Sequence, residues 1–434
     1  METPGSDLGR KRSMRRAAVD LLRQNPALRV FLAASLITSL GSALTRIAVY
    51  GKLAAFGASP LLFGSAYALS IIPSLVAARL GMKALRRFGT VRTLIGTEVL
   101  GMAGVAVPWT AITNHSASLL VLSMMLPSIA SGLAVGSYAA LIKGLVRAPD
   151  YSTFSALDSL SFTGSSVLGT GLAALAYGLI PIHWYLLCDI ASYVAAMIGF
   201  WYLGTRPVGR HGCFPVAAKP DTSRAWHEVM PRLRGARLRA FLLLPLMAAT
   251  NGAAMALLPV LGTHFRAIGL EATLAVDPTV LLVFARTVGQ AAGSLLLQPA
   301  RVQAVFFSNR TLIILVAVYI GLYAFAFGVQ PSPGTFVLVL MVVVLAHVAS
   351  NVVYVVANTA SFAHFTESET PIVSTRANQL TTGILAITSI LAGSLADDVS
   401  LLTAMLTLSI PAFVAYVAVV LTSGQPVRAR QGDA

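Results

Sequence analysis

The sequence predicts an all-α membrane protein. Of its 434 residues, 56% are hydrophobic and 11% are charged, which leaves too little polar surface for a water-soluble globule of this size. Apolar runs of about twenty residues or more recur along the chain, and an α-helix of that length crosses about 30 Å of hydrocarbon. The strands of a membrane barrel would instead alternate over segments of about ten residues. We therefore expect a multi-pass helical protein, whose spans satisfy their own backbone hydrogen bonds.

Twelve segments are apolar and long enough to be spans. They cover residues 30–56, 61–81, 92–111, 117–142, 153–180, 184–204, 240–261, 279–299, 311–329, 335–360, 377–396 and 400–422. One long hydrophilic segment interrupts them after the sixth span and divides the chain into halves of similar size. The predicted organisation is a basic N-terminal segment (1–29), a first six-helix half (30–204), a linker (205–239), a second six-helix half (240–422) and a tail (423–434).

The basic residues indicate the topology. The net charge is +15, and alternate connections between the spans carry nearly all of the Lys and Arg residues. The positive-inside rule places these connections, and with them both termini, in the cytoplasm. Because the charges mark one membrane face, we do not expect nucleic acid as a partner. We expect contact with anionic lipid headgroups at the cytoplasmic face of the plasma membrane.

The linker contains four prolines and eight basic residues. Its distal part, Arg224 to Arg239, alternates Trp226 and Val229 with basic residues. This pattern predicts an amphipathic helix at the membrane surface, and an ordinary basic linker explains it equally well. Cys213 in the linker and Cys188 near the outer end of the sixth span lie on opposite sides of the membrane, so no disulfide between them is expected.

Polar residues inside the spans are the strongest functional evidence, because they are costly in hydrocarbon. Along the first helix a polar face recurs at steps of three and four and includes Arg46, about 24 Å from Val30 and so in the outer half of the membrane. Three interpretations of Arg46 stay open: it binds substrate, it pairs with Asp189 near the outer end of the sixth helix, or its side chain extends to the interface.

Other spans carry similar polar positions. His347, Asn351, Tyr354 and Asn358 lie on one face of the tenth helix, Arg286, Gln290 and Ser294 on one face of the eighth, and Thr250 and Asn251 on the seventh. Each of these residues has an alternative role in helix packing. Glu98 in the third helix and Asp158 in the fifth are acids at membrane depth that either carry a proton or pair with a basic residue such as Arg92 or Lys143.

Several stretches resemble one transporter family. Asn25 to Ala48, Ser59 to Gly81 and Asp150 to Ala173 are similar to the first, second and fifth helices of the enterobactin-exporter and macrolide-efflux branch of the major facilitator superfamily. The resemblance implies two six-helix halves around a central cavity. It also implies that residues near the cavity bind substrate: Arg46, Asn251, Arg286, Gln290, His347, Asn351 and Tyr354. Asp158 and Glu98 are the candidates for proton coupling.

The chain departs from the family pattern at several positions. In the connection GMKALRRFGTVR, Gly81 to Arg92, Leu85 or Arg86 stands where the family has an acid. The first helix has Ser42 where related exporters tend to carry an Asp, and the fifth has Ser165 and Ser166 in place of a Gly-Pro pair. A stripe of small residues in the fifth helix, Ser161, Ser165, Gly169 and Ala173, favours close helix packing. These departures argue against the family's standard antiport coupling.

The expected function is secondary active transport. We expect an exporter of a small, anionic organic compound such as a siderophore, antibiotic or other metabolite, working as a proton-coupled monomer. An uptake transporter and an uncoupled scaffold or sensor are the alternatives. An enzyme is not expected, because the seven histidines are scattered and no metal-ligand spacing, phosphate loop or nucleophile motif occurs, so we expect no cofactor and no metal.

Overall fold

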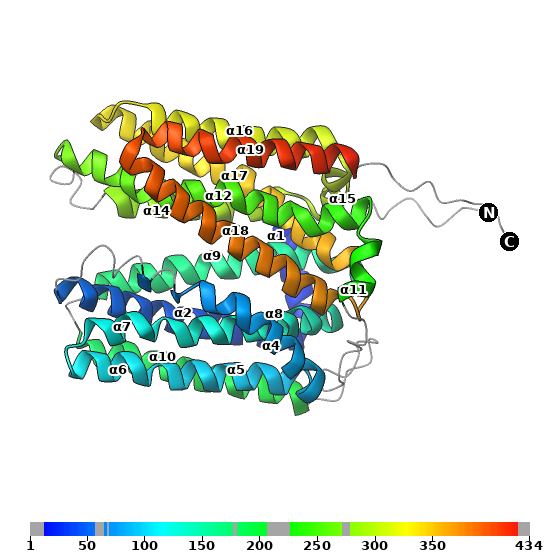
Figure 1. The fold of residues 1–434 in the computed structure, drawn as a ribbon. Helices are drawn as coiled ribbons and strands as arrows, with labels where there is room; N and C mark the ends of the chain where they lie inside the picture. The colour runs from blue at the N-terminus through cyan, green and yellow to red at the C-terminus, as the bar shows by residue number, and fades with distance from the viewer. Residues whose placement is uncertain are drawn as a thin grey trace, which may run out of the picture.

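The computed structural model describes residues 13–56, 65–66, 69–176, 180–205, 226–270 and 278–423. Figure 1 shows long helices that run in roughly the same direction and form two groups, one drawn above the other. The lower group contains α2 to α10 and the upper group contains α12 to α19, so each half of the chain forms its own bundle.

The lower bundle, here called the N-half, is built from residues before the linker. Its helices are α2 (Pro26–Ala55), α4 (Ile72–Phe88), α5 (Thr90–Gly104), α6 (Ala106–Thr113), α7 (Ala117–Ser123), α8 (Met125–Leu145), α9 (Tyr151–Ala176) and α10 (Ile182–Thr205). Two spans are each divided into two helices, one at Val105 and one at Met124. A short helix, α1 (Met14–Gln24), precedes α2, and a 3₁₀ turn (Ala148–Asp150) precedes α9.

The upper bundle, here called the C-half, follows the linker. Its helices are α12 (Ala236–Ala267), α14 (Pro278–Leu296), α16 (Asn309–Gly328), α17 (Pro333–Ala363), α18 (Thr370–Asp398) and α19 (Leu401–Thr422). The short helix α15 (Pro299–Phe307) follows α14 at an angle of 99°. Two prolines lie inside α12, at Pro245 and Pro259, where neighbouring helices support the interrupted backbone.

The chain is a multi-pass membrane protein. Within the described residues, nine helices are long and apolar enough to cross a membrane, or ten if α14 and α15 count as one bent span. The helices α4 and α9 pack among them. The count of twelve spans, the boundaries of the two halves and the cytoplasmic position of both termini stay predictions.

Close backbone packing holds the N-half together. A Cβ atom added to Gly81 of α4 would lie under 3.0 Å from the backbone of Leu133 in α8, and one added to Gly132 of α8 would lie equally close to Ser74 of α4. Gly169, from the small-residue stripe predicted in the fifth helix, faces Ala43 of α2 at a similarly close approach. At these positions the absence of a side chain lets helix axes approach each other, as expected for small residues in membrane helices.

The two halves meet along a seam. On one side of the seam α9 packs against α14 and α17, and on the other α18 packs against α4 and α8. One end of the bundle, here called the basic end, contains α1, the C-terminal turns of α4 and α8, the start of α12 and the connection between α17 and α18. Arg86 and Arg87 end α4 there, and Lys143 lies in the last turn of α8.

The predicted surface helix in the linker is wrong in its described part. Residues 206–225 lie outside the described residues, and Cys213 is among them. From Trp226 the chain forms the four-residue helix α11 (Trp226–Val229) and a 3₁₀ turn (Met230–Arg232), and α12 begins at Ala236, four residues before the predicted span. Pro231 has no N–H to continue a helix, and Gly235 has a φ of 52°, which helical residues do not adopt.

Candidate functional site

A carboxylate lies at the seam. Asp158 of α9 accepts hydrogen bonds from the hydroxyl of Tyr138 in α8, from the hydroxyl of Tyr354 in α17 at 3.2 Å and from Asn358 Nδ2 at 3.5 Å. Two of these three donors belong to the opposite half. The alternative that Asp158 pairs with Lys143 is wrong, because Lys143 donates to backbone carbonyls elsewhere. Asp158 thus joins the two halves through hydroxyl and amide donors.

Asn351 forms a second polar contact across the seam. Its Oδ1 accepts a hydrogen bond from Ser159 Oγ of α9 at 2.8 Å, and its Nδ2 donates to the backbone oxygen of Gln290 at 2.7 Å and to Ser294 Oγ at 2.6 Å. The Asn351 side chain is buried. Ser159 follows Asp158 directly, so consecutive residues of α9 bind the same face of α17.

His347 and Asn251 bind within the C-half. His347 is fully buried; its Nε2 lies 2.6 Å from the hydroxyl of Tyr323 in α16, and its ring meets that of Tyr319 edge-on. The hydroxyl of Tyr319 donates to Asn251 Oδ1 at 2.8 Å. These contacts connect α12, α16 and α17, and they agree with the packing interpretation of His347.

The two predicted arginines differ in their surroundings. Arg286 of α14 is half-buried and places Nη1 2.7 Å from the sulfur of Met255 in α12. Arg46 of α2 is exposed, and within the described residues it forms no ion pair with Asp189. Arg46 therefore forms no direct ion pair with Asp189, although its charge still acts on that carboxylate.

Two other acids of the N-half, Asp189 and Glu98, bind hydroxyl groups. Asp189 is 1% exposed and accepts hydrogen bonds from Thr45 Oγ1 at 2.6 Å and, more weakly, from Ser192 and Ser42. Glu98 accepts a hydrogen bond from Thr38 Oγ1 at 2.8 Å, and the alternative that Glu98 pairs with Arg92 is wrong. Asp189, Glu98 and Arg46 all lie away from the seam contacts of Asp158.

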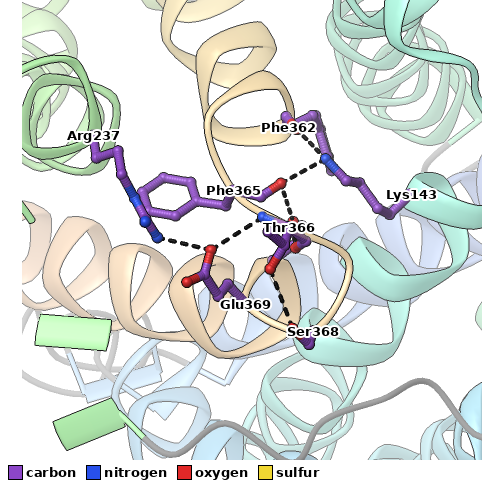
Figure 2. Close-up of polar contacts among 8 residues, drawn as sticks. Lys143, Arg237, Phe362, Phe365, Thr366, Ser368 and Glu369 are labelled. Atoms are coloured by element: carbon purple, nitrogen blue, oxygen red, sulfur yellow. Dashed lines mark hydrogen bonds and ion pairs between the residues drawn. The ribbon is translucent and has the colours of Figure 1, made fainter. Parts of the chain in front are cut away.

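A network that the sequence did not predict closes the basic end (Figure 2). Lys143 Nζ donates to the backbone oxygen of Phe362 and, at 2.7 Å, to that of Phe365. These carbonyls end α17, where the helix dipole favours a positive charge. The ring of Phe362 lies 5.7 Å from that of Tyr151 and 5.9 Å from that of Phe154, both in α9. A cation and an aromatic ring thus connect the halves at the same turn.

The connection between α17 and α18 is also fixed from the C-half. Arg237 Nη2 of α12 lies 2.7 Å from Glu369 Oε2, which also accepts a hydrogen bond from the backbone N–H of Thr366 at 3.1 Å (Figure 2). Burial favours the neutral carboxyl, but the hydrogen bonds and the charge of Arg237 outweigh it and lower the pKa of Glu369 to about 2. The sequence marked Arg237 only as a topology signal and Lys143 as a possible partner of an acid. Neither contact was predictable for Lys143, since backbone acceptors leave no side-chain pattern.

Comparison with known proteins supports this architecture. No protein-family model and no curated protein matches the chain. Among solved structures, a bacterial homologue of the iron transporter ferroportin, outward-facing with soaked iron, has a TM-score of 0.69 at 15% identity and covers 92% of this chain and 99% of that one. The proton:xylose symporter XylE of the major facilitator superfamily has a TM-score of 0.65 at 13% identity, over 95% of this chain and 96% of that one.

The chain has the major facilitator fold. The human organic anion transporter MFSD10 is also similar, with a TM-score of 0.57, 16% identity and coverage of 94% of this chain and 98% of that one. In the major facilitator fold the seam described above separates the two halves. Asp158, Asn351 and Tyr354 form contacts across it. Gln290 binds Asn351 through its backbone oxygen, Asn251 and His347 pack inside the C-half, and Glu98 packs inside the N-half. The resemblance to the enterobactin-exporter and macrolide-efflux branch stays a prediction.

Proposed function

We propose that the protein is a secondary active transporter that exports a small organic compound by alternating access, as a monomer in the cytoplasmic membrane. One observation carries the proposal. Hydrogen bonds between the halves involve Lys143, Asp158, Ser159 and Gln379. These four residues lie at the end of α8 or within the first ten residues of α9 and α18, so these polar contacts gather toward the basic end. Halves joined in this way can separate at one end while they stay packed at the other.

With the basic end placed in the cytoplasm, we propose that the structure represents an outward-facing state. Lys and Arg gather there, as the positive-inside rule predicts for the cytoplasmic side. Structures that the fold resembles include a ferroportin homologue in an outward-facing state. In such a state the contacts of Lys143 and Asp158 form the cytoplasmic gate.

An anion is the proposed substrate. Arg46 presents an exposed guanidinium, and a guanidinium holds a carboxylate by two parallel hydrogen bonds. Arg286 lies at the middle of α14, whereas Arg46 lies in the third of α2 away from the basic end. Gln290, one turn from Arg286, supplies a partly exposed amide. The structurally similar MFSD10 is an organic anion transporter.

Flux measurement in proteoliposomes tests the proposal. The purified protein should move an anionic amphiphile identified by a thermal-stabilisation screen, and Arg46→Ala with Arg286→Ala should abolish this transport. Normal transport of the anion by the double variant would remove both arginines from the site. A preference for cations would overturn the substrate class and leave the transporter intact. The direction of net substrate flux distinguishes export from uptake. If none of the stabilising compounds is transported, an uncoupled scaffold or sensor is favoured.

A further inference from the structure

We propose that α1 is a strap that crosses the seam at the basic end and stabilises the closed gate. The inference deepens the proposed function, since it concerns the alternation between states that transport requires. Helix α1 packs against α2 and α9 in the N-half and against α14 in the C-half. Figure 1 shows α1 between the two groups of helices at the end where α15 lies.

One end of the strap is fixed to the N-half. Asn25 is the residue between α1 and α2. Its backbone N–H donates a hydrogen bond to the backbone oxygen of Leu21 and so caps the C-terminal end of α1. The Asn25 side chain accepts a hydrogen bond from the N–H of Leu28 in α2 at 2.9 Å and donates to the backbone oxygen of Leu145 at the end of α8 at 2.7 Å. Asn25 therefore ties three helices of one half together.

The other end reaches the C-half. Met14 is 1% exposed and belongs to the larger cluster of buried apolar side chains, whose members come mostly from the C-half and also include Met82, Leu85 and Ala156 of the N-half. The contact of α1 with the C-half is its packing against α14. Leu21, two turns later, belongs instead to the cluster that fills the basic end of the N-half. Ser13 caps the first turn by accepting a hydrogen bond from the N–H of Arg16 at 3.4 Å. The buried stripe of a single helix thus divides its contacts between the halves.

The sequence of α1 explains why it adheres to this surface. Met14, Ala18 and Leu21 are its buried residues, and they recur at the spacing of one helical face. Val19 on another face is 41% exposed. A helix of 11 residues is too short to persist alone in water, so this packing is what maintains it.

Opening the gate breaks the contact at Met14. Because Asn25 holds α1 to the N-half, the strap moves with that half and withdraws Met14 from the C-half. The apolar surface of Met14 then meets water at the membrane face, which disfavours the open state. The strap therefore shifts the equilibrium toward the closed basic end without touching substrate.

Spin-label distances test the strap in the full-length protein, with both native cysteines replaced by serine. One pair of labels, at the exposed positions Arg87 and Gln303, reports separation of the halves at the basic end. Met14→Ser should raise the ratio of open to closed molecules about tenfold, in keeping with the burial of one large apolar side chain. Val19→Ser changes the same helix at an exposed position and should leave the ratio unchanged.

Identical distance distributions for Met14→Ser and Val19→Ser would overturn the strap. If Met14→Ser does not fold, Met14→Ala removes most of the same contact with better helix propensity and gives the same test. The outcome is separable from that of the proposed function. If Met14→Ser shifts the spin-label distances but no substrate flux is found, the strap is retained and transport is rejected. If flux is found but Met14→Ser does not shift the distances, transport is retained and the strap is rejected.

Discussion

At the scale of single residues, the seam depends on a carboxylate and a cation with different partners. Asp158 accepts hydrogen bonds from donors of both halves, whereas Lys143 donates to the backbone of the opposite half. Protonation of Asp158 replaces one acceptor by a donor, so it changes the bonds between α9 and α17 directly. Lys143 keeps its bonds in either case. We therefore propose that Asp158 couples transport to protons and that Lys143 closes the gate.

Asp158→Asn should uncouple transport from protons. The amide has nearly the same shape as the carboxyl and bears no exchangeable charge, so substrate exchange should continue while an imposed pH gradient no longer drives accumulation. The measurement is uptake into proteoliposomes with and without the gradient. Glu98→Gln, at the second candidate acid, is the comparison, and coupling that survives in Asp158→Asn and is lost in Glu98→Gln would reverse the assignment.

Arg239→Met should lower the stability of the C-half. The Arg239 guanidinium is fully buried and donates to the backbone oxygens of Phe306 and Val420, to Asn309 Oδ1 at 2.6 Å and to Ser423 Oγ at 3.2 Å. Its loss leaves several buried acceptors without donors, at a cost of about 3 kcal/mol in unfolding free energy.

The exposed Arg234→Met is the matched control for Arg239→Met, and its stability should stay within about 0.5 kcal/mol of the native protein. Thermal unfolding of both variants in the same detergent is the measurement. Equal midpoints would mean that the Arg239 contacts contribute nothing net.

At the scale of helices, glycines bring helices together inside the N-half, whereas larger side chains lie between the two halves. Gly81 and Gly132 bring α4 and α8 into backbone contact inside the N-half, whereas the seam has side chains such as Phe362 and Tyr354 between its helices. Helices that pack through backbone move together, because their separation would open a void along the whole contact. We therefore expect α4 and α8 to move together.

Gly132→Ala should destabilise the N-half even though alanine is the better helix former. The added Cβ would lie under 3.0 Å from the backbone of Ser74, so α4 and α8 must separate. Gly144→Ala in the same helix meets nothing within 4 Å and should be neutral or stabilising by up to about 1 kcal/mol. Comparison of the two thermal midpoints checks this, and a stable Gly132→Ala protein would show that α4 and α8 yield at this contact.

The pair of Arg237 and Glu369 predicts how the α17 to α18 connection responds to acid. The pKa of Glu369 is lowered from 4.5 to about 2 in the folded protein, so its stabilising effect is complete above pH 4.5. The effect falls as the pH drops from 4.5 toward 2, and it amounts to about 3 kcal/mol at most. Glu369→Gln should therefore be less stable than the native protein at pH 6, and the difference should shrink at pH 3.

Glu367→Gln provides the control for this pH series. Glu367 is exposed in the same connection, and its substitution should leave the profile of thermal midpoint against pH unchanged. A constant difference between the native protein and Glu369→Gln from pH 6 to pH 3 would contradict the lowered pKa.

At the scale of the whole molecule, the multi-pass helical architecture follows from the sequence, because hydrocarbon imposes a length and an apolar composition on every span. Polar faces were also informative: Asn351 and Tyr354, predicted to share a helical face, both contact α9, at Ser159 and Asp158. The sequence did not predict which residues these polar side chains contact. Tyr138 lies in a helix that carried no candidate. His347 shares a helical face with Asn351, but His347 contacts Tyr323 of the C-half whereas Asn351 contacts Ser159 of the N-half.

Lys143→Met should open the basic end of the molecule. Methionine keeps much of the length and apolar character of the side chain but has no donor, so the carbonyls that end α17 lose their cap and the halves lose a polar link. The spin-label pair at Arg87 and Gln303 should move apart, and a second pair at the exposed positions His115 and Gln330 should approach. Lys83→Met, at an exposed lysine of the same end, should change neither distance, and unaltered distances in Lys143→Met would remove this residue from the gate.

Lys143 donates to main-chain oxygens, so the contact depends on the identity of one residue and not of two. A salt bridge constrains the residues on both sides, so both must persist or change together. The contact in Figure 2 constrains only Lys143, since any residue that continues α17 offers the same oxygens. Substitutions at the end of α17 therefore leave the hydrogen bonds of Lys143 intact, and no pair of co-varying sequence positions would reveal the contact. Such a gate survives while the recognisable motifs of a lineage disappear.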